Sequence, residues 1–247
     1  MNFVNVIILF VYYNLTLQQQ KVVLYLISQI SPYDEDFKLY TFDIQEFCKV
    51  IGADETSGGN YSYLKNVIQQ IADKSLWVRL DDGRETLLRW IDRPYIDENS
   101  GIIQIRLDEL MKPYLLQLKK NYTTYEIAYT LLFKSRYSLR LYEIIKSIHF
   151  HELEEYKRKY EIDEIKRMMG AEIYKEYRDF KRKALIKAIE EINAHSDKLI
   201  SYEEVKRGRK VVAIEFTITT KPAVECMKLR EKIDLSLGPE RLTFWDS

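Results

Sequence analysis

The sequence is poor in the residues that hold small folds together through covalent or metal bonds. It has only two cysteines, Cys48 and Cys226, so we expect no disulfide framework and reduced thiols in an intracellular protein. No spacing of cysteine and histidine resembles a zinc site, and we expect no metal. Glycine (8 of 247 residues) and proline (5) are also scarce, whereas hydrophobic residues make up 46%. This balance argues against a disordered chain and favours long helices and strands with short connections.

A long apolar run is missing as well. The amino-terminal run, Val6–Tyr13, is too short to span a bilayer, which needs about 20 apolar residues. The first charged residue is Lys21, so the start also lacks the basic region of a signal peptide. β-branched and aromatic residues dominate the run, which favours a buried strand over a membrane anchor. We therefore expect a cytoplasmic protein with no membrane partner.

Neither sign of charge prevails in the whole chain, which has 38 basic and 38 acidic residues. A neutral total argues at first against a nucleic-acid partner, but the charges are unevenly distributed. Residues 31–60 carry seven acids against two lysines, whereas residues 178–187 carry five basic residues against Asp179 alone. Residues 206–210 read Lys-Arg-Gly-Arg-Lys. This pattern predicts a basic face that phosphates would contact.

The first half of the chain predicts three helices followed by strands. Thr16 and Gln19 have the spacing of a capping box, and Asp43 stands where it would cap a short helix. A turn at Asp81-Asp82-Gly83 between two apolar segments predicts a hairpin. The expected elements are helices over 16–30 and 43–52, a third helix through Leu64, Val67, Ile68 and Ile71, and strands over 76–80, 86–90 and 102–107.

The second half repeats this order. Tyr160-Glu161-Ile162-Asp163 echoes Tyr40-Thr41-Phe42-Asp43, and each segment precedes a short helix that ends at a glycine. The expected elements are a helix through Tyr137, Leu141, Ile144, Ile145 and Ile148, a short helix ending at Gly170, a long helix from Tyr177 to about Ala194, and strands over 199–202 and 211–217.

Helix, helix–turn–helix and hairpin together make the winged-helix plan, which this order shows twice. We therefore predict an α+β protein of two tandem winged-helix domains. The first, residues 1–120, is assigned to self-association and auxiliary DNA contact. The second, residues 121–247, is assigned to the main DNA binding and ends in a short tail. The alternative left open is two unrelated α+β domains with similar helix signals.

Two parts of the second half are basic where a winged-helix protein meets DNA. On the long helix, Lys181 lies within the apolar stripe, which indicates that the first turns project beyond the core as a recognition helix must. A solvated charged face explains that helix equally well by itself, but the basic hairpin favours binding. The predicted DNA-binding residues are Arg178, Lys181, Arg182 and Lys183 on this helix, Lys206, Arg207, Arg209 and Lys210 around Gly208 at the hairpin tip, and Lys65 on the third helix of the first half.

Four segments together carry a family resemblance that covers roughly residues 14 to 220. They are Phe133–Glu143 (FKSRYSLRLYE), Phe180–Lys183 with Glu191-Ile192-Asn193 and Lys206–Val211, Leu15–Lys21, and Pro113–Leu118. In order and spacing they resemble the replication initiators of iteron-containing, theta-replicating plasmids. Two features depart from that family. Lys187 stands where it usually has a proline, and Met1–Tyr13 does not resemble its usual start.

The resemblance implies a two-winged-helix protein with no enzymatic activity and no cofactor. Monomers of such proteins bind directly repeated sites in the double-stranded plasmid origin, help to open it, and recruit the host initiator and the replicative helicase. Dimers, associated largely through the first domain, often bind an inverted repeat and repress the initiator's own gene. By motif position, the resemblance assigns DNA contact to Arg178, Lys181, Arg182 and the Lys206–Lys210 hairpin tip.

Three other functions remain as alternatives. His149-Phe150-His151 matches the metal-binding pattern of rolling-circle nicking enzymes, for which Tyr156, Tyr160, Tyr174 or Tyr177 would supply the nucleophile. That pattern follows a helical stripe, however, and on a helix the two histidines would diverge. No Walker loop, HExxH or Gly-x-Ser-x-Gly motif is present, so we expect no catalytic residue. A winged-helix transcriptional repressor and a partner-binding module without DNA affinity are the other two alternatives.

Overall fold

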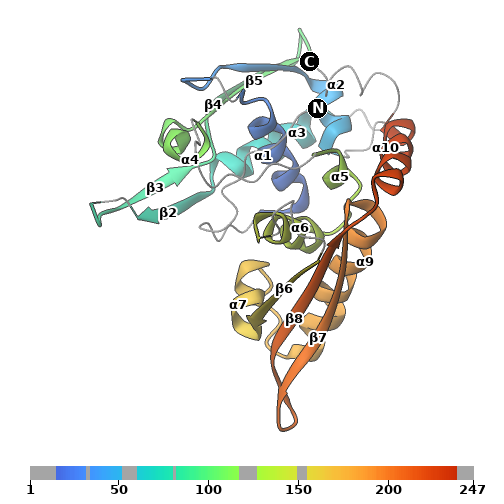
Figure 1. The fold of residues 1–247 in the computed structure, drawn as a ribbon. Helices are drawn as coiled ribbons and strands as arrows, with labels where there is room; N and C mark the ends of the chain where they lie inside the picture. Colours follow the sequence, from blue (N-terminus) through green and yellow to red (C-terminus); the bar gives the residue numbers. More distant parts are fainter. Residues whose placement is uncertain are drawn as a thin grey trace. The chain divides into compact units, whose positions relative to one another are not determined.

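The computed structural model describes residues 15–31, 34–51, 60–79, 82–116, 127–148 and 155–237. These residues form two compact units, of which the first ends at Ile127 and the second begins at Ala128 (Figure 1). The apolar start that we predicted as a strand, residues 1–13, lies outside the described residues.

The first unit contains the predicted helices and hairpin in the predicted order. Two strands of this unit, β1 and β4, were missed, and β4 contains Pro94. Proline is tolerated there because β4 lies at a sheet edge and its pairing with β5 shifts register between Asp92 and Tyr95. The elements are α1 (Leu17–Ser28), β1 (Tyr40–Asp43), α2 (Ile44–Ile51), α3 (Asn60–Ala72), β2 (Ser75–Arg79), β3 (Glu85–Arg89), β4 (Ile91–Asp97), β5 (Ile102–Leu107), the 3₁₀ turn η1 (Glu109–Met111) and α4 (Lys112–Leu115).

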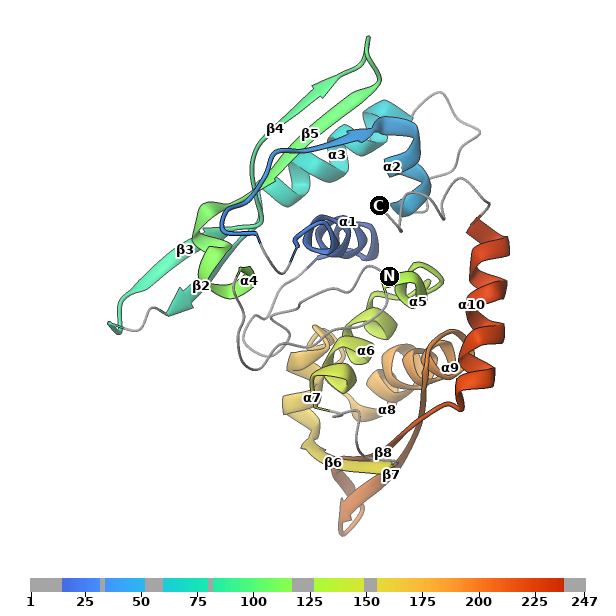
Figure 2. The ribbon, with the colours of Figure 1, turned by 45° about the horizontal axis from the view of Figure 1, so that its top comes forward.

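Helix α1 begins at the predicted capping box. The Thr16 hydroxyl accepts a hydrogen bond from the Gln19 backbone N–H, and the Gln19 side chain accepts one from the Thr16 N–H. The prediction of one apolar face is too narrow, because the residues from Val22 to Ile27 are all buried. The helix lies beside α2 and α3 (Figure 2), and the Tyr25 ring packs on Phe42 and Phe47 at 5.0 and 5.4 Å between centroids. Helix α1 is therefore the centre of the core of this unit.

The second unit also has the predicted order, with longer strands. The predicted long helix is continuous from Tyr177 to His195. Its segment Lys181–Leu185, η2, is π-helical instead of α-helical. Residues 223–237 of the tail form a helix. The elements are α5 (Ile127–Leu131), α6 (Arg136–Ile148), β6 (Glu155–Glu161), α7 (Ile162–Met168), α8 (Tyr177–Phe180), η2 (Lys181–Leu185), α9 (Ile186–His195), β7 (Lys198–Arg207), β8 (Lys210–Thr220) and α10 (Ala223–Leu237).

The two units differ in how their sheets are assembled. In the second unit, β6 and β7 both pair with β8, which gives one three-stranded sheet in the order β6-β8-β7. In the first unit, β1 pairs with β5 in the order β1-β5-β4, and the hairpin β2–β3 forms a separate two-stranded sheet. The repeat seen in the sequence is therefore a repeat of element order, with a different strand pairing in each unit.

Helix α6 connects the other elements of the second unit through side-chain bonds. The Glu191 carboxylate on α9 accepts hydrogen bonds from the backbone N–H groups of Lys134 and Ser135, just before α6 begins. Farther along α6, Arg140 donates to the Met168 carbonyl at the end of α7 (2.7 Å) and forms a buried ion pair with Glu143. These bonds fix α7 and α9 against α6.

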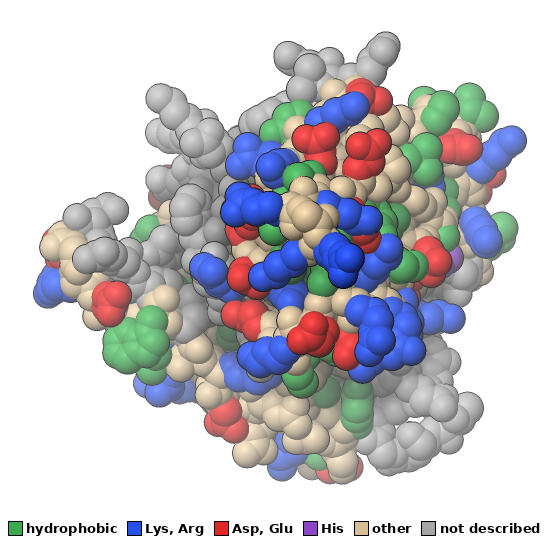
Figure 3. Space-filling view, turned by 90° about the horizontal axis from the view of Figure 1, so that it is seen from below, with side chains coloured by type: hydrophobic (Ala, Val, Ile, Leu, Met, Phe, Trp, Pro, Cys, Tyr) green, Lys and Arg blue, Asp and Glu red, His purple; other side chains and the backbone are tan. Residues whose placement is uncertain are grey.

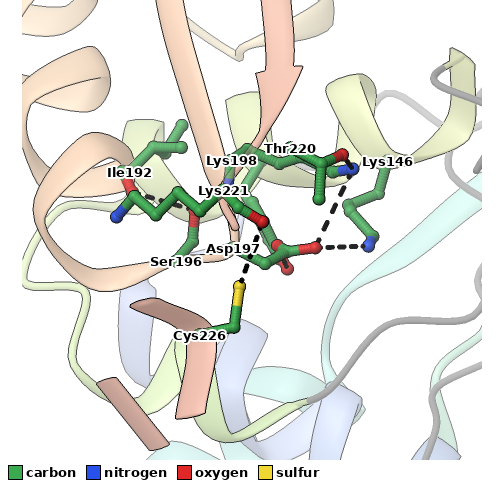
Figure 4. Close-up of polar contacts among 9 residues, drawn as sticks. Lys146, Ile192, Ser196, Asp197, Lys198, Thr220, Lys221 and Cys226 are labelled. Carbon is green, nitrogen blue, oxygen red and sulfur yellow. Dashed lines mark hydrogen bonds and ion pairs between the residues drawn. The ribbon is translucent and has the colours of Figure 1, made fainter. Parts of the chain in front are cut away.

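A second buried network fixes the junction where α9 ends and β7 begins (Figure 4). The Asp197 carboxylate accepts hydrogen bonds from the Tyr142 hydroxyl (2.7 Å) and from Lys146 Nζ (3.0 Å) on α6. The fully buried Lys198 ammonium donates to the Thr220 hydroxyl at 2.6 Å and lies 3.8 Å from the Asp197 carboxylate. The network thus holds the first residue of β7 and the last residue of β8 against α6.

The charges of this network depend on one another. Burial lowers the pKa of the Lys198 ammonium to about 8, although the Asp197 carboxylate opposes this change. Burial alone would raise the pKa of the Asp197 carboxyl, but Lys146, Lys198 and the Tyr142 hydroxyl hold it below its usual value. Asp197 is therefore ionised at neutral pH and serves as the counter-charge for two buried lysines.

Replacing Asp197 by asparagine should lower the free energy of unfolding by about 3–5 kcal/mol, because it leaves buried ammonium groups without their counter-charge. Chemical denaturation followed by circular dichroism would measure the change. Glu172→Gln removes an exposed carboxylate of the same unit, and as a control it should alter this free energy by no more than about 0.5 kcal/mol. An Asp197→Asn protein as stable as the wild type would show that the network does not stabilise the fold.

Candidate nucleic-acid interface

The start of the helix α8–η2–α9 presents three of the predicted basic side chains to solvent. Phe180, Ala184 and Leu185 are fully buried and hold this helix on the unit. Arg178 is exposed, and the side chains of Arg182 and Lys183 are 73% and 46% exposed. The backbone at Lys181–Leu185 is π-helical, a distortion that often accompanies functional sites.

The β7–β8 hairpin presents the other basic group. Its pairing with β6 ends at Ala213, whereas β7 and β8 stay paired out to Arg207 and Lys210, so the hairpin extends past the three-stranded sheet. Gly208 makes the tight turn with a φ of 61°, a conformation that favours glycine. The four basic residues at the tip, Lys206, Arg207, Arg209 and Lys210, are all exposed.

Figure 3 views the protein from the side toward which this hairpin points. Lys and Arg side chains crowd that face, with Asp and Glu side chains among them. At the start of the basic helix, the Asp179 carboxylate on α8 lies 3.6 Å from Arg182 and 3.9 Å from Lys183. Such exposed ion pairs are weak, so a phosphate could displace the carboxylate.

Lys181 is placed differently from what its position in the apolar stripe predicted. The structure pairs its ammonium with the Glu204 carboxylate of β7 at 2.7 Å, and Lys181 Nζ lies 6.0 Å from the centre of the Tyr202 ring. The same Glu204 oxygen accepts a hydrogen bond from the Tyr177 hydroxyl at 2.8 Å. The ion pair with Glu204 on β7, the first strand of the hairpin, therefore explains why a lysine stands in the apolar stripe. Our explanation that the first turns project beyond the core was wrong.

The first unit offers a less basic surface at the corresponding places. Lys65 on α3 is exposed, with its ammonium 5.9 Å from the centre of the Tyr61 ring. Arg84 beside the turn of the first hairpin forms an ion pair with Asp82 at 2.6 Å. Trp77 on β2 is 70% exposed and stands opposite the exposed Leu87 on β3. The hairpin of this unit therefore carries an exposed apolar pair on its strands, whereas the second hairpin carries lysine and arginine at its tip.

Sequence reasoning missed one further group of basic residues. Lys157, Arg158 and Lys159 are exposed on β6, an edge strand. They were left unassigned because the charged segment around them gave no strand signal. Lys187, which replaces the usual proline of the resembling family, is exposed on α9, and the helix continues through it.

The residues of the nicking-enzyme alternative gain little support. His149 and His151 lie outside the described residues. The pKa of the Tyr160 hydroxyl is raised by burial, that of Tyr177 by burial and by Glu204, and that of Tyr174 by its hydrogen bond with Tyr137. Raised pKa values disfavour the phenolate that would attack a phosphodiester.

Two searches cover the part of the chain that the structure describes. Among those residues, no group of three or more His, Cys, Asp or Glu side chains could hold a metal ion. None of the helices in the described ranges has the length and apolar character that crossing a membrane requires.

Both units combine three helices with a β-hairpin, so this is a protein with two winged-helix domains. Its sequence matches the family described as "Initiator Replication protein, WH1" over residues 4–146 and that described as "Initiator Rep protein, WH2" over residues 161–218. The chain belongs to this family of replication initiator proteins. The first match extends past Ile127 and includes α6, which in the structure packs on α9.

Two solved structures are among those to which the chain was matched. The chain is similar to the crystal structure of the Pi initiator protein in complex with iteron DNA, with a TM-score of 0.70 and 19% identity over 84% of this chain and 92% of that chain. It also aligns with the WH1 domain of MSBI1.176, a replication protein isolated from a multiple sclerosis patient. That alignment has a TM-score of 0.32 and 17% identity over 42% of this chain and 82% of that chain. The likeness to Pi shows that the two-domain fold is shared.

Replacing Asp179 by asparagine should strengthen binding to duplex DNA of any sequence, by up to about fivefold at low salt, because the carboxylate beside Arg182 and Lys183 competes with phosphate. Fluorescence anisotropy would measure the affinity. The control is Asp163→Asn, which removes an exposed acid from α7. Equal affinities of the wild type and Asp179→Asn would show that these two basic side chains do not meet DNA.

Proposed function

We propose that this protein is a plasmid replication initiator that binds repeated sites, iterons, in double-stranded origin DNA sequence-specifically. The observation that carries the proposal is the pairing of two exposed basic elements in the second unit. Arg178 and Arg182 lie at the start of one helix, the Lys206–Lys210 turn lies at the hairpin tip, and Glu204 bonds the helix to the strand of that hairpin. Pi, which has the same fold, was crystallised with iteron DNA, and this supports the proposal.

The two elements would have different roles. The helix is of a size to enter the major groove, where an arginine can donate two hydrogen bonds to guanine. We assign base reading to Arg178 and Arg182, and contact with the phosphate backbone to Lys183 and the hairpin tip. Lys181 is assigned to the same surface, where its pairing with Glu204 suits it to holding the helix in place.

The first unit would supply self-association and an auxiliary DNA contact. Trp77 and Leu87 form an exposed apolar pair, which suits contact with another protein surface better than contact with phosphate. Lys65 is the candidate for the auxiliary DNA contact. The family resemblance extends the proposal to opening of the origin, recruitment of the host initiator and replicative helicase, and repression of the initiator's own gene by a dimer.

A transcriptional repressor is the alternative with the same interface. It would use the same helix and hairpin, so the interface cannot distinguish the two functions. The organisation of the target DNA distinguishes them, because an initiator binds several direct repeats beside its gene and supports replication of a plasmid that carries them.

A salt-dependent anisotropy titration against origin DNA that flanks the gene, with and without divalent metal, would test the proposal. Tight binding that increases stepwise with the number of repeats and leaves the DNA uncut is the expected result. Metal-dependent nicking would favour the enzyme alternative at His149 and His151. An equal affinity for repeats and for scrambled DNA would overturn the proposal.

Two single substitutions should separate base reading from backbone contact. Arg182→Ala should reduce discrimination at one base pair by about 1–3 kcal/mol, because an arginine that reads a base is removed. Lys206→Ala should weaken binding to every sequence alike and reduce the salt slope by about one unit. Titrations of both variants against matched and single-mismatch sites would measure these effects. Equal losses on all sequences from both variants would contradict the assignment of the recognition helix.

A further inference from the structure

Glu204 is an acid at the centre of the face that we assign to DNA. Its Oε1 atom accepts hydrogen bonds from the Tyr177 hydroxyl (2.8 Å) and from Lys181 Nζ (2.7 Å), and its Oε2 atom lies 3.7 Å from Lys206 Nζ. One carboxylate therefore bonds both to the helix and, through Lys206, to the hairpin tip. We call Tyr177, Lys181 and Glu204 the helix–wing clamp.

The acid disfavours DNA binding in purely electrostatic terms. Hydrogen bonds from Lys181 and Tyr177 hold the pKa of the Glu204 carboxyl below its usual value, so the group is ionised at neutral pH. A negative charge on this face repels phosphate whatever the base sequence. Loss of that charge would therefore raise the affinity for all DNA. Attraction to DNA does not explain the presence of Glu204, so we look for its role in its contacts with the helix.

The clamp is well placed to orient the base-reading side chains. Arg178 directly follows Tyr177, and Arg182 directly follows Lys181. The Lys181 carbonyl also accepts the π-helical hydrogen bond from the Ile186 N–H, so the clamp holds the residue at which the helix changes its geometry. Base readout depends on the direction of an arginine fork, whereas attraction to phosphate depends mainly on charge.

We propose that Glu204 is a positioning residue that fixes the recognition helix on the wing strand, and that it sets sequence discrimination while weakening total affinity. The proposal rests on the proposed function, since it assigns a specificity role within that same interface. The Glu204 carboxylate itself touches no base.

Two substitutions of opposite charge test the clamp from its two sides. Glu204→Gln adds one positive unit to the face and should tighten binding to a scrambled duplex. Lys181→Met removes one positive unit and should weaken that binding. Both should lower the ratio of affinities for iteron and scrambled duplexes by about tenfold, because both release the helix from the wing. Fluorescence anisotropy at one salt concentration would give both affinities for each protein.

A matched control separates charge from position. Glu203→Gln neutralises an exposed acid next to Glu204 on the opposite face of β7, so it changes the net charge by the same amount but should change the ratio little. The Lys181→Met Glu204→Gln double variant should have the same ratio as either single variant, because both remove one shared interaction. Unchanged thermal unfolding midpoints would show that the variants are folded, and Lys181→Met provides the same test if Glu204→Gln does not fold.

The outcomes for this proposal and for the proposed function are distinct. If the wild type prefers the iteron and both Glu204→Gln and Lys181→Met keep that preference, the clamp does not set discrimination and this inference is overturned alone. If the wild type shows no preference, the proposed function fails, and the clamp proposal fails with it.

Discussion

The Asp197 carboxylate, at the junction between α9 and β7, is the group on which the geometry of the second unit most depends. Tyr142 and Lys146 of α6 donate to it, and Lys198 lies beside it with no exposed surface. The helix α8–η2–α9 precedes this junction and the β7–β8 hairpin follows it, so the junction sets the angle between the two elements. A largely buried carboxylate with several donors tolerates little movement, because each donor would lose its partner.

Two of the segments that carry the family resemblance, residues 133–143 and 191–193, have structural roles in this fold. In the 133–143 segment, Arg140 and Tyr142 bond to α7 and to the α9–β7 junction. Glu191 caps the approach to α6, and both polar atoms of the Asn193 side chain pair with the backbone of Ile200 on β7. These motif residues hold the helix α8–η2–α9 and the β7–β8 hairpin in place. The residues that would read DNA are fewer, and they lie at the exposed start of the helix and at the exposed tip of the hairpin.

The net charge of the chain does not show where the basic residues of the candidate interface lie. A count of those basic residues overstates the positive charge of that surface, because acids lie among them. Asp179 stands beside Arg182 and Lys183, and Glu204 pairs with Lys181. The acids reduce attraction to phosphate but limit the positions that the basic side chains occupy. Weaker attraction to phosphate together with better-defined side-chain positions suits an interface that must distinguish one DNA site from many similar ones. Non-specific attraction favours every site alike.

Local sequence alone determined the order of the main helices and of the two hairpins, the capping box at Thr16 and the turn at Gly208. These features depend on residues within a few positions of one another, so short-range hydrogen bonds and backbone preferences are enough to specify them. It also gave the basic side chains of the helix start and the hairpin tip as candidates. The tertiary structure decided that β1 pairs with β5 while β6 pairs with β8, that the buried Lys198 lies beside the Asp197 carboxylate, and that Lys181 bonds to the wing. Pairings such as Lys181 with Glu204 or Lys146 with Asp197 join residues far apart in the chain, and a charge pattern cannot show which partners the fold brings within hydrogen-bonding distance.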